Sequence, residues 1–101
     1  MNGQATPRTA EQLFYRCAPT IVWARDEGRV IVVDDQDKRS WLLDGIEAAI
    51  WDWVTMGYAH PRIVSMVSLT LKGSDAQAET LLENTLHRWY LAGLVQLEGT
   101  T

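Results

Sequence analysis

The side chains that most often carry catalysis or bind metals are few in this chain and widely spaced. Its two histidines are His60 and His87, and neither has a cysteine or an H-x-x-x-H partner. The one cysteine, Cys17, cannot form an internal disulfide or supply a multi-thiolate metal site. We therefore expect no metal, no cofactor and an inert thiol at Cys17.

Motifs of known catalytic sites are also missing. A Ser/His/Asp triad is not excluded by counting residues, but the sequence has no G-x-S-x-G elbow and no glycine-rich phosphate loop. Asp34, Asp35 and Asp37 form an acidic cluster that lacks the spacing of a calcium loop, which favours a solvated turn. We therefore expect no catalytic residues, and the chain is predicted not to be an enzyme.

The composition indicates one globular domain with a net negative charge. A chain of 101 residues with 47% hydrophobic residues can bury a stable core without disulfides or structural metal ions. The formal net charge of −4 argues against a general binder of nucleic acid or of anionic membranes, since both need clustered positive charge. The polar N-terminus shows no signal peptide, and no apolar run approaches the roughly 20 residues of a membrane span. A cytoplasmic protein without a membrane partner is expected.

The elements that must position any site begin with three predicted strands. Residues 20–25, 29–33 and 39–43 are rich in β-branched and aromatic residues and are separated by short polar turns. Such a pattern predicts an antiparallel meander in which the second strand lies in the middle. Because Val30–Val33 carries no charge, we expect this strand to be buried on both faces or nearly so. The outer strands end in arginines, as edge strands often do.

Three helices are predicted after the strands. At Asp44 the apolar period changes from two to 3.6, and Asp44 with Glu47 can form a capping box. Pro61 suits the start of a second helix, and Ser74 or Asp75 can cap a third, which Gly93 ends. The order of strands and helices indicates an α+β, winged-helix-like fold. Residues 1–18 are expected to be a flexible N-terminal tail or arm, and Leu94–Leu97 a short extended tail.

The charges on the third helix argue against DNA as a partner. This helix would enter the major groove, yet it carries Asp75, Glu79 and Glu83 against a single Arg88. The exposed edge of the third strand is the other candidate surface, because an extended peptide can add to it as a further strand. The alternative is that its charged residues only protect that edge.

The segment Trp41–Trp51 resembles the central signature of the PqqD-like family. This signature is an aromatic residue, an aliphatic pair, Asn or Asp, a small residue, and a helix with two small residues before Ile-Trp; here it is WLLDGIEAAIW. The later Ile63–Val64 and Gly93–Leu94 pairs also match, so the resemblance covers about residues 19–97. Met56–Ala59 replaces the common Asp-Gly turn, which favours a PqqD-like protein outside the pyrroloquinoline quinone pathway.

The resemblance implies a winged-helix-like domain over residues 19–98 that recognises ribosomally made, modified peptides. Such domains bind the leader of a precursor peptide as an added strand and deliver it to a modifying enzyme, often a radical S-adenosylmethionine enzyme, a cyclase or a protease. Carried onto this sequence, the peptide-binding residues form a strand edge and a helix wall, namely Lys38, Arg39, Ser40, Trp41 and Leu42, and Leu82, Thr85, Leu86 and Trp89. Two alternatives stay open: a winged-helix DNA-binding regulator, and a purely structural subunit of a partner enzyme.

Overall fold

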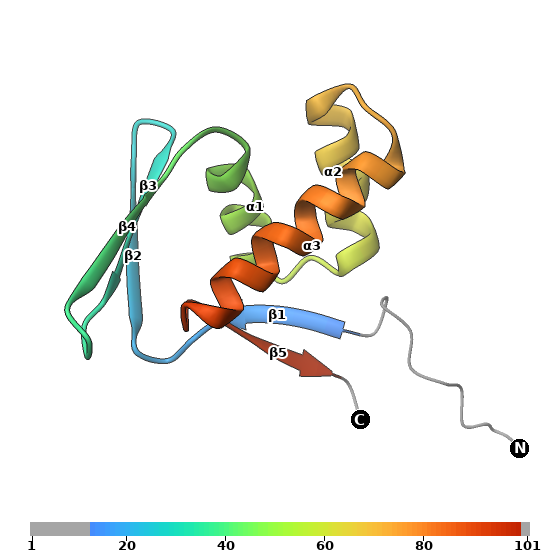
Figure 1. Cartoon of the computed structure of the whole chain (residues 1–101). Helices are drawn as coiled ribbons and strands as arrows, with labels where there is room; N and C mark the ends of the chain where they lie inside the picture. The colour runs from blue at the N-terminus through green and yellow to red at the C-terminus, as the bar shows by residue number, and fades with distance from the viewer. Residues whose placement is uncertain (1–12, 100–101) are drawn as a thin grey trace, which may run out of the picture.

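A three-stranded antiparallel sheet followed by three helices forms the centre of the molecule, as the computed structural model of residues 13–99 shows (Figure 1). The strands are β2 (Ile21–Asp26), β3 (Arg29–Asp34) and β4 (Arg39–Leu43), and they pair in the order β2-β3-β4. The helices are α1 (Gly45–Thr55), α2 (His60–Leu71) and α3 (Asp75–Leu91). The predicted α+β fold and the central position of β3 are confirmed. No helix among these residues is long and apolar enough to cross a membrane.

A second sheet joins the two ends of the described chain. Strand β1 (Leu13–Cys17) pairs antiparallel with β5 (Val95–Gly99), and both lie beneath the C-terminal end of α3 in Figure 1. Sequence analysis does not predict this pairing, because each strand is short and lies about eighty residues from its partner, as the register Cys17↔Val95 shows. Residues 1–12 of the predicted tail lie outside the described residues. The domain boundary at residue 19 stays a prediction.

Only one face of the three-stranded sheet is buried. Along β3, Val30 and Val32 are fully buried, whereas Ile31 between them is 40% exposed. The prediction that this strand is buried on both faces is therefore wrong. The helices lie on one side of the sheet (Figure 1), and β-branched residues also suit the open side of a pleated strand.

Trp51 lies at the centre of the core that the sheet and helices share. It is fully buried, and its ring meets those of Trp23 and Trp89 edge to face, at centroid distances of 6.1 and 5.3 Å. Trp23 comes from β2 and Trp89 from α3, so one side chain of α1 connects the sheet with the last helix.

The N-termini of α1 and α3 are capped differently. The Ser74 hydroxyl accepts a hydrogen bond from the Gln77 N–H at 3.1 Å, and the Gln77 side chain accepts one from the Ser74 N–H at 3.0 Å. This capping box confirms Ser74 as the cap of α3. Asp44 makes no side-chain cap bond, so the box predicted with Glu47 is wrong. The Glu47 carboxylate instead accepts a hydrogen bond from Arg88 at 2.7 Å.

Candidate functional site

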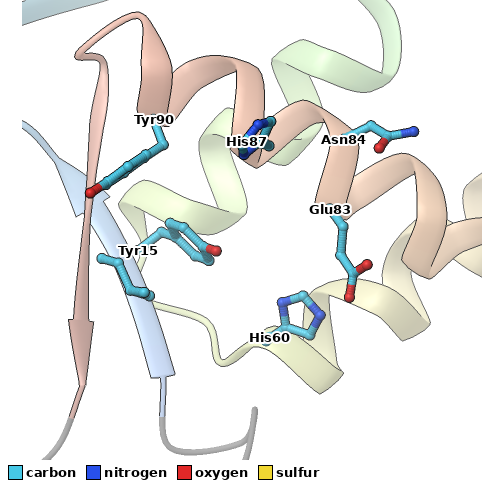
Figure 2. A pocket seen from close by; sticks show the side chains of 7 residues that line it. Tyr15, His60, Glu83, Asn84, His87 and Tyr90 are labelled. Atoms are coloured by element: carbon cyan, nitrogen blue, oxygen red, sulfur yellow. The ribbon is translucent and has the colours of Figure 1, made fainter.

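The residues whose types could carry chemistry lie in two places: Cys17 lines one hollow, and His60 and His87 line another. Cys17 is half-buried, and burial raises the pKa of its thiol, which keeps it protonated at neutral pH. His60 and His87, far apart in the sequence, both line a cavity of about 480 Å³ between α2, α3 and the β1–β5 sheet (Figure 2). Burial and the nearby Glu83 carboxylate raise the pKa of Tyr15 in the same cavity, so its phenol stays neutral.

Strand β4 forms one edge of its sheet, and the hydrogen-bond pattern shows which backbone groups face outward. In antiparallel strands, residues that bond to their partner alternate with residues that do not. The Asp35 N–H donates to the Thr20 carbonyl at 3.3 Å, so this pair is bonded and the next pair, Ile21↔Asp34, is not. Continuing the register, Val33, Ile31 and Arg29 direct their backbone groups to β2.

The same alternation then fixes the other side of β3. Val30, Val32 and Asp34 must bond to β4, where their partners are Leu43, Trp41 and Arg39. The backbone N–H and C=O groups of Ser40 and Leu42 therefore point away from β3. No strand among residues 13–99 pairs with that edge. The turn from β2 to β3 supports this assignment of bonded and non-bonded pairs. Glu27 and Gly28 both have positive φ, 52° and 83°, which is typical of a two-residue hairpin turn. In such a turn the flanking residues, here Asp26 and Arg29, form a hydrogen-bonded pair.

The side chains of β4 alternate between the two faces of the sheet. Leu43 is buried and Trp41 half-buried on the helix side, whereas Ser40 and Leu42 are exposed on the open side. This is the alternation that a β-strand imposes on successive side chains. On the open side, Leu42 is 57% exposed and lies opposite Ile31, with Val22 also exposed on β2. We call these three residues, Val22, Ile31 and Leu42, the outer-face cluster.

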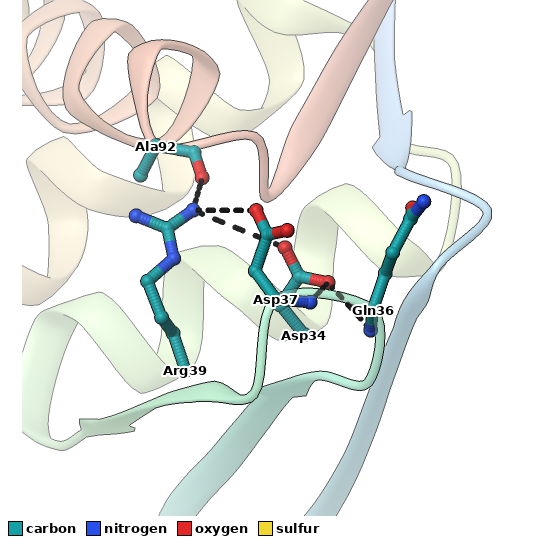
Figure 3. A network of polar contacts seen from close by, with 5 residues as sticks. All are labelled: Asp34, Gln36, Asp37, Arg39 and Ala92. Carbon is teal, nitrogen blue, oxygen red and sulfur yellow. Dashed lines mark hydrogen bonds and ion pairs between the residues drawn. The ribbon is translucent and has the colours of Figure 1, made fainter.

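Arg39 connects the start of β4 to the end of α3 (Figure 3). Its guanidinium donates to the Ala92 carbonyl at 2.9 Å and lies 3.9 and 3.8 Å from the carboxylates of Asp34 and Asp37. Asp34 is itself buried and accepts hydrogen bonds from the Gln36 and Asp37 N–H groups. The acidic residues thus shape the turn before β4, and Arg39 places α3 beside the strand. The guanidinium also stacks over Trp41, 5.0 Å from the ring centroid.

The residues predicted as a helix wall lie in the core. Exposure ranges from 0 to 3% for the four side chains Leu82, Thr85, Leu86 and Trp89. A peptide cannot touch them in this conformation, and they instead hold α3 against the rest of the domain. The flank of α3 toward α1 carries Arg88, exposed and bonded to Glu47, with Leu81 and Ala92 partly buried nearby along the helix. Leu81 and Ala92 are not among the residues predicted for the helix wall.

Comparison with known proteins gives one informative result. No protein-family profile matches this sequence, and no curated protein does either. Among solved structures, TbiB1 in complex with the TbiA(beta) leader peptide superposes with a TM-score of 0.76, over 80% of this chain and 94% of that chain. The fold of this chain is similar to that of TbiB1.

The likeness to TbiB1 concerns the fold. Only 18% of the aligned residues are identical, so the similarity to TbiB1 does not establish the ligand of this chain. Membership of the PqqD-like family likewise stays a prediction. What the comparison adds is a solved example of the α+β arrangement described above, in a complex with a leader peptide.

Proposed function

We propose that this chain binds the leader of a ribosomally synthesised precursor peptide by strand addition at the edge of β4 and presents it to a modifying enzyme, without catalysis of its own. The observation that carries the proposal is the outward direction of the backbone groups of Ser40 and Leu42 on an edge strand. The similarity to TbiB1 supports it, because that protein has the same fold and was solved with a leader peptide.

In strand addition, the side chains of the leader would contact residues on both faces of the sheet. The backbone of the leader would pair with Ser40 and Leu42, while its side chains alternate in direction. One set would lie beside Trp41 and the flank of α3 that carries Arg88, and the other set beside Leu42 and the rest of the outer-face cluster. Apolar side chains lie on both faces, namely Trp41, Leu81 and Ala92 on one and the outer-face cluster on the other. We therefore expect a leader with apolar residues at successive positions of the bound segment, directed to alternate faces.

Charge contributes little to this recognition. The basic residues near the edge already have partners: Lys38 lies 3.4 Å from Asp35, Arg39 bonds to Ala92, and Arg88 bonds to Glu47. These contacts offset part of the positive charge that the edge would present to an acidic leader. Backbone hydrogen bonds and apolar contacts should therefore dominate the affinity.

The test is a titration with the leader peptide of a precursor whose gene neighbours the gene for this chain. Binding is monitored by tryptophan fluorescence at two salt concentrations. We expect saturable binding whose Kd changes less than about threefold between roughly 50 and 200 mM salt. The reason is that the leader would be held by backbone hydrogen bonds and apolar contacts, with few ion pairs. A DNA-binding regulator would instead bind duplex DNA and lose about a thousandfold in affinity over that range. A purely structural subunit would bind the partner enzyme and show no affinity for any leader.

The chemistry would be performed by a separate modifying enzyme. A radical S-adenosylmethionine enzyme, a cyclase or a protease would act on the core of the precursor while its leader stays on β4. Cys17, His60 and His87 lie in β1, α2 and α3, and none of them belongs to β4.

A further inference from the structure

Three side chains with metal-binding atoms converge between the start of α2 and the first half of α3. His60 is the first residue of α2, and Glu79 and Glu83 follow one helical turn apart on α3. One ligand atom from each residue lies within 4.8 Å of the others. In Figure 2 the Glu83 carboxylate projects from α3 toward the His60 ring, across the mouth of the cavity. We propose that His60, Glu79 and Glu83 bind a divalent transition-metal ion of the Zn²⁺ type.

The imidazole of His60 is available to coordinate a metal ion, because it makes no hydrogen bond within residues 13–99. Its side chain is only 11% exposed, and its Nε2 atom lies 3.7 Å from a Glu79 carboxylate oxygen. That separation is too long for a hydrogen bond and slightly longer than the spacing of two ligands on one ion. Rotation of the Glu79 side chain, which is 51% exposed, can close the remaining gap.

The charges of the cluster favour a bound cation. Glu79 and Glu83 are four residues apart on one helix, where two like charges repel. In the part of the chain that the structure describes, no lysine or arginine lies within ion-pair distance of either carboxylate, and the His60 Nε2 atom lies 3.7 Å from a Glu79 oxygen. A dication between them would replace this repulsion by attraction. A surface pair of glutamates alone would not indicate a site, but here a nearly buried imidazole from another helix completes the set.

The chemistry of the ligands selects the class of ion. One imidazole nitrogen and two carboxylate oxygens are a ligand set of Zn²⁺ and neighbouring transition metals, whereas Ca²⁺ and Mg²⁺ prefer oxygen alone. Three protein ligands would leave a fourth position open, and two of them, His60 and Glu83, line the cavity. Water or a group from a partner would fill that position.

Such an ion would tie the N-terminus of α2 to α3. Neither histidine belongs to a local ligand motif, so the sequence does not predict a metal. Only the packing of α2 on α3 brings His60 to the glutamates. Glu83 lies on the flank of α3 away from Arg88, and Arg88 faces α1 near β4. The ion and the leader should therefore bind independently, so failure of one proposal leaves the other intact.

The experiment is a calorimetric titration of the full chain with ZnCl₂, combined with thermal unfolding. We expect binding of one Zn²⁺ per chain and a rise in Tm of roughly 10 °C at a free concentration about a hundred times Kd. His60→Gln and Glu83→Gln should each weaken binding at least about tenfold, because each removes a ligand. His87→Gln is the matched control: it changes the other histidine of the same cavity and should leave Kd within about twofold.

Glu79→Gln keeps the proposal testable if His60→Gln unfolds the chain, because Glu79 is half exposed and its loss removes a repulsion. This variant should fold and bind Zn²⁺ at least about tenfold more weakly. No binding of Zn²⁺ by the native chain would overturn the proposal. So would binding that survives His60→Gln or Glu79→Gln, or that His87→Gln abolishes.

Discussion

Replacement of Ser40 by proline is expected to weaken leader binding about tenfold or more while the domain stays folded. The Ser40 N–H points to the free edge of β4, where it would donate to a carbonyl of the added strand. Proline removes that donor, worth about 1 kcal/mol, and its ring occupies the space of the incoming strand. The ladder between β3 and β4 should survive, because it uses the backbone groups of Arg39, Trp41 and Leu43.

Ser40→Ala is the matched control for this prediction. It removes the hydroxyl of an exposed side chain and keeps the backbone N–H, so leader affinity should stay within about twofold of the native value. Circular dichroism of both variants would establish that the fold is intact. Equal affinity of the proline and alanine variants would show that the leader does not pair with this backbone group.

Replacement of Trp51 by alanine is expected to lower the free energy of unfolding by about 3–5 kcal/mol. The side chain is fully buried and touches Trp23 of β2 and Trp89 of α3, so its loss opens a cavity where sheet and helices meet. A domain of this size has only about 5–15 kcal/mol of stability, so the variant should be partly unfolded at 37 °C. Urea unfolding followed by far-ultraviolet circular dichroism would measure the loss.

Trp51→Phe separates packing from hydrogen bonding at the same position. The buried indole N–H of Trp51 has no hydrogen-bond partner among residues 13–99, so phenylalanine loses ring area but no such bond. We expect a loss of about 1–2 kcal/mol, well below that of alanine. If alanine costs less than about 1 kcal/mol, the side chain does not join the sheet to α3 as the packing indicates.

Much of the fold can be predicted from the sequence because its signals are local. The change from period two to 3.6 at Asp44 separates sheet from helices, and Ser74 is recognisable as a cap. The pairing of β1 with β5 is not predictable in this way, because it depends on contacts between opposite ends of the chain. Burial of β3 on a single face also depends on where the helices pack, which Val30–Val33 cannot reveal.

The candidate site shows the same division. The edge position of β4 and the alternation of Trp41 and Leu42 are predictable from strand order and period. The choice of Ser40 and Leu42 as the outward backbone groups requires the phase of the ladder, which depends on the bond between Asp35 and Thr20. The four helix residues of the predicted wall are buried in this conformation, because an apolar stripe along a helix marks the side that packs on the core.

Amide hydrogen exchange of β4 with and without the leader peptide tests the central claim most directly. In the free chain the N–H groups of Ser40 and Leu42 should exchange fast, while that of Trp41, bonded to β3, is protected. Saturating leader should slow exchange at Ser40 and Leu42 and leave Trp41 nearly unchanged. Leader binding that leaves Ser40 and Leu42 unprotected would contradict strand addition at this edge.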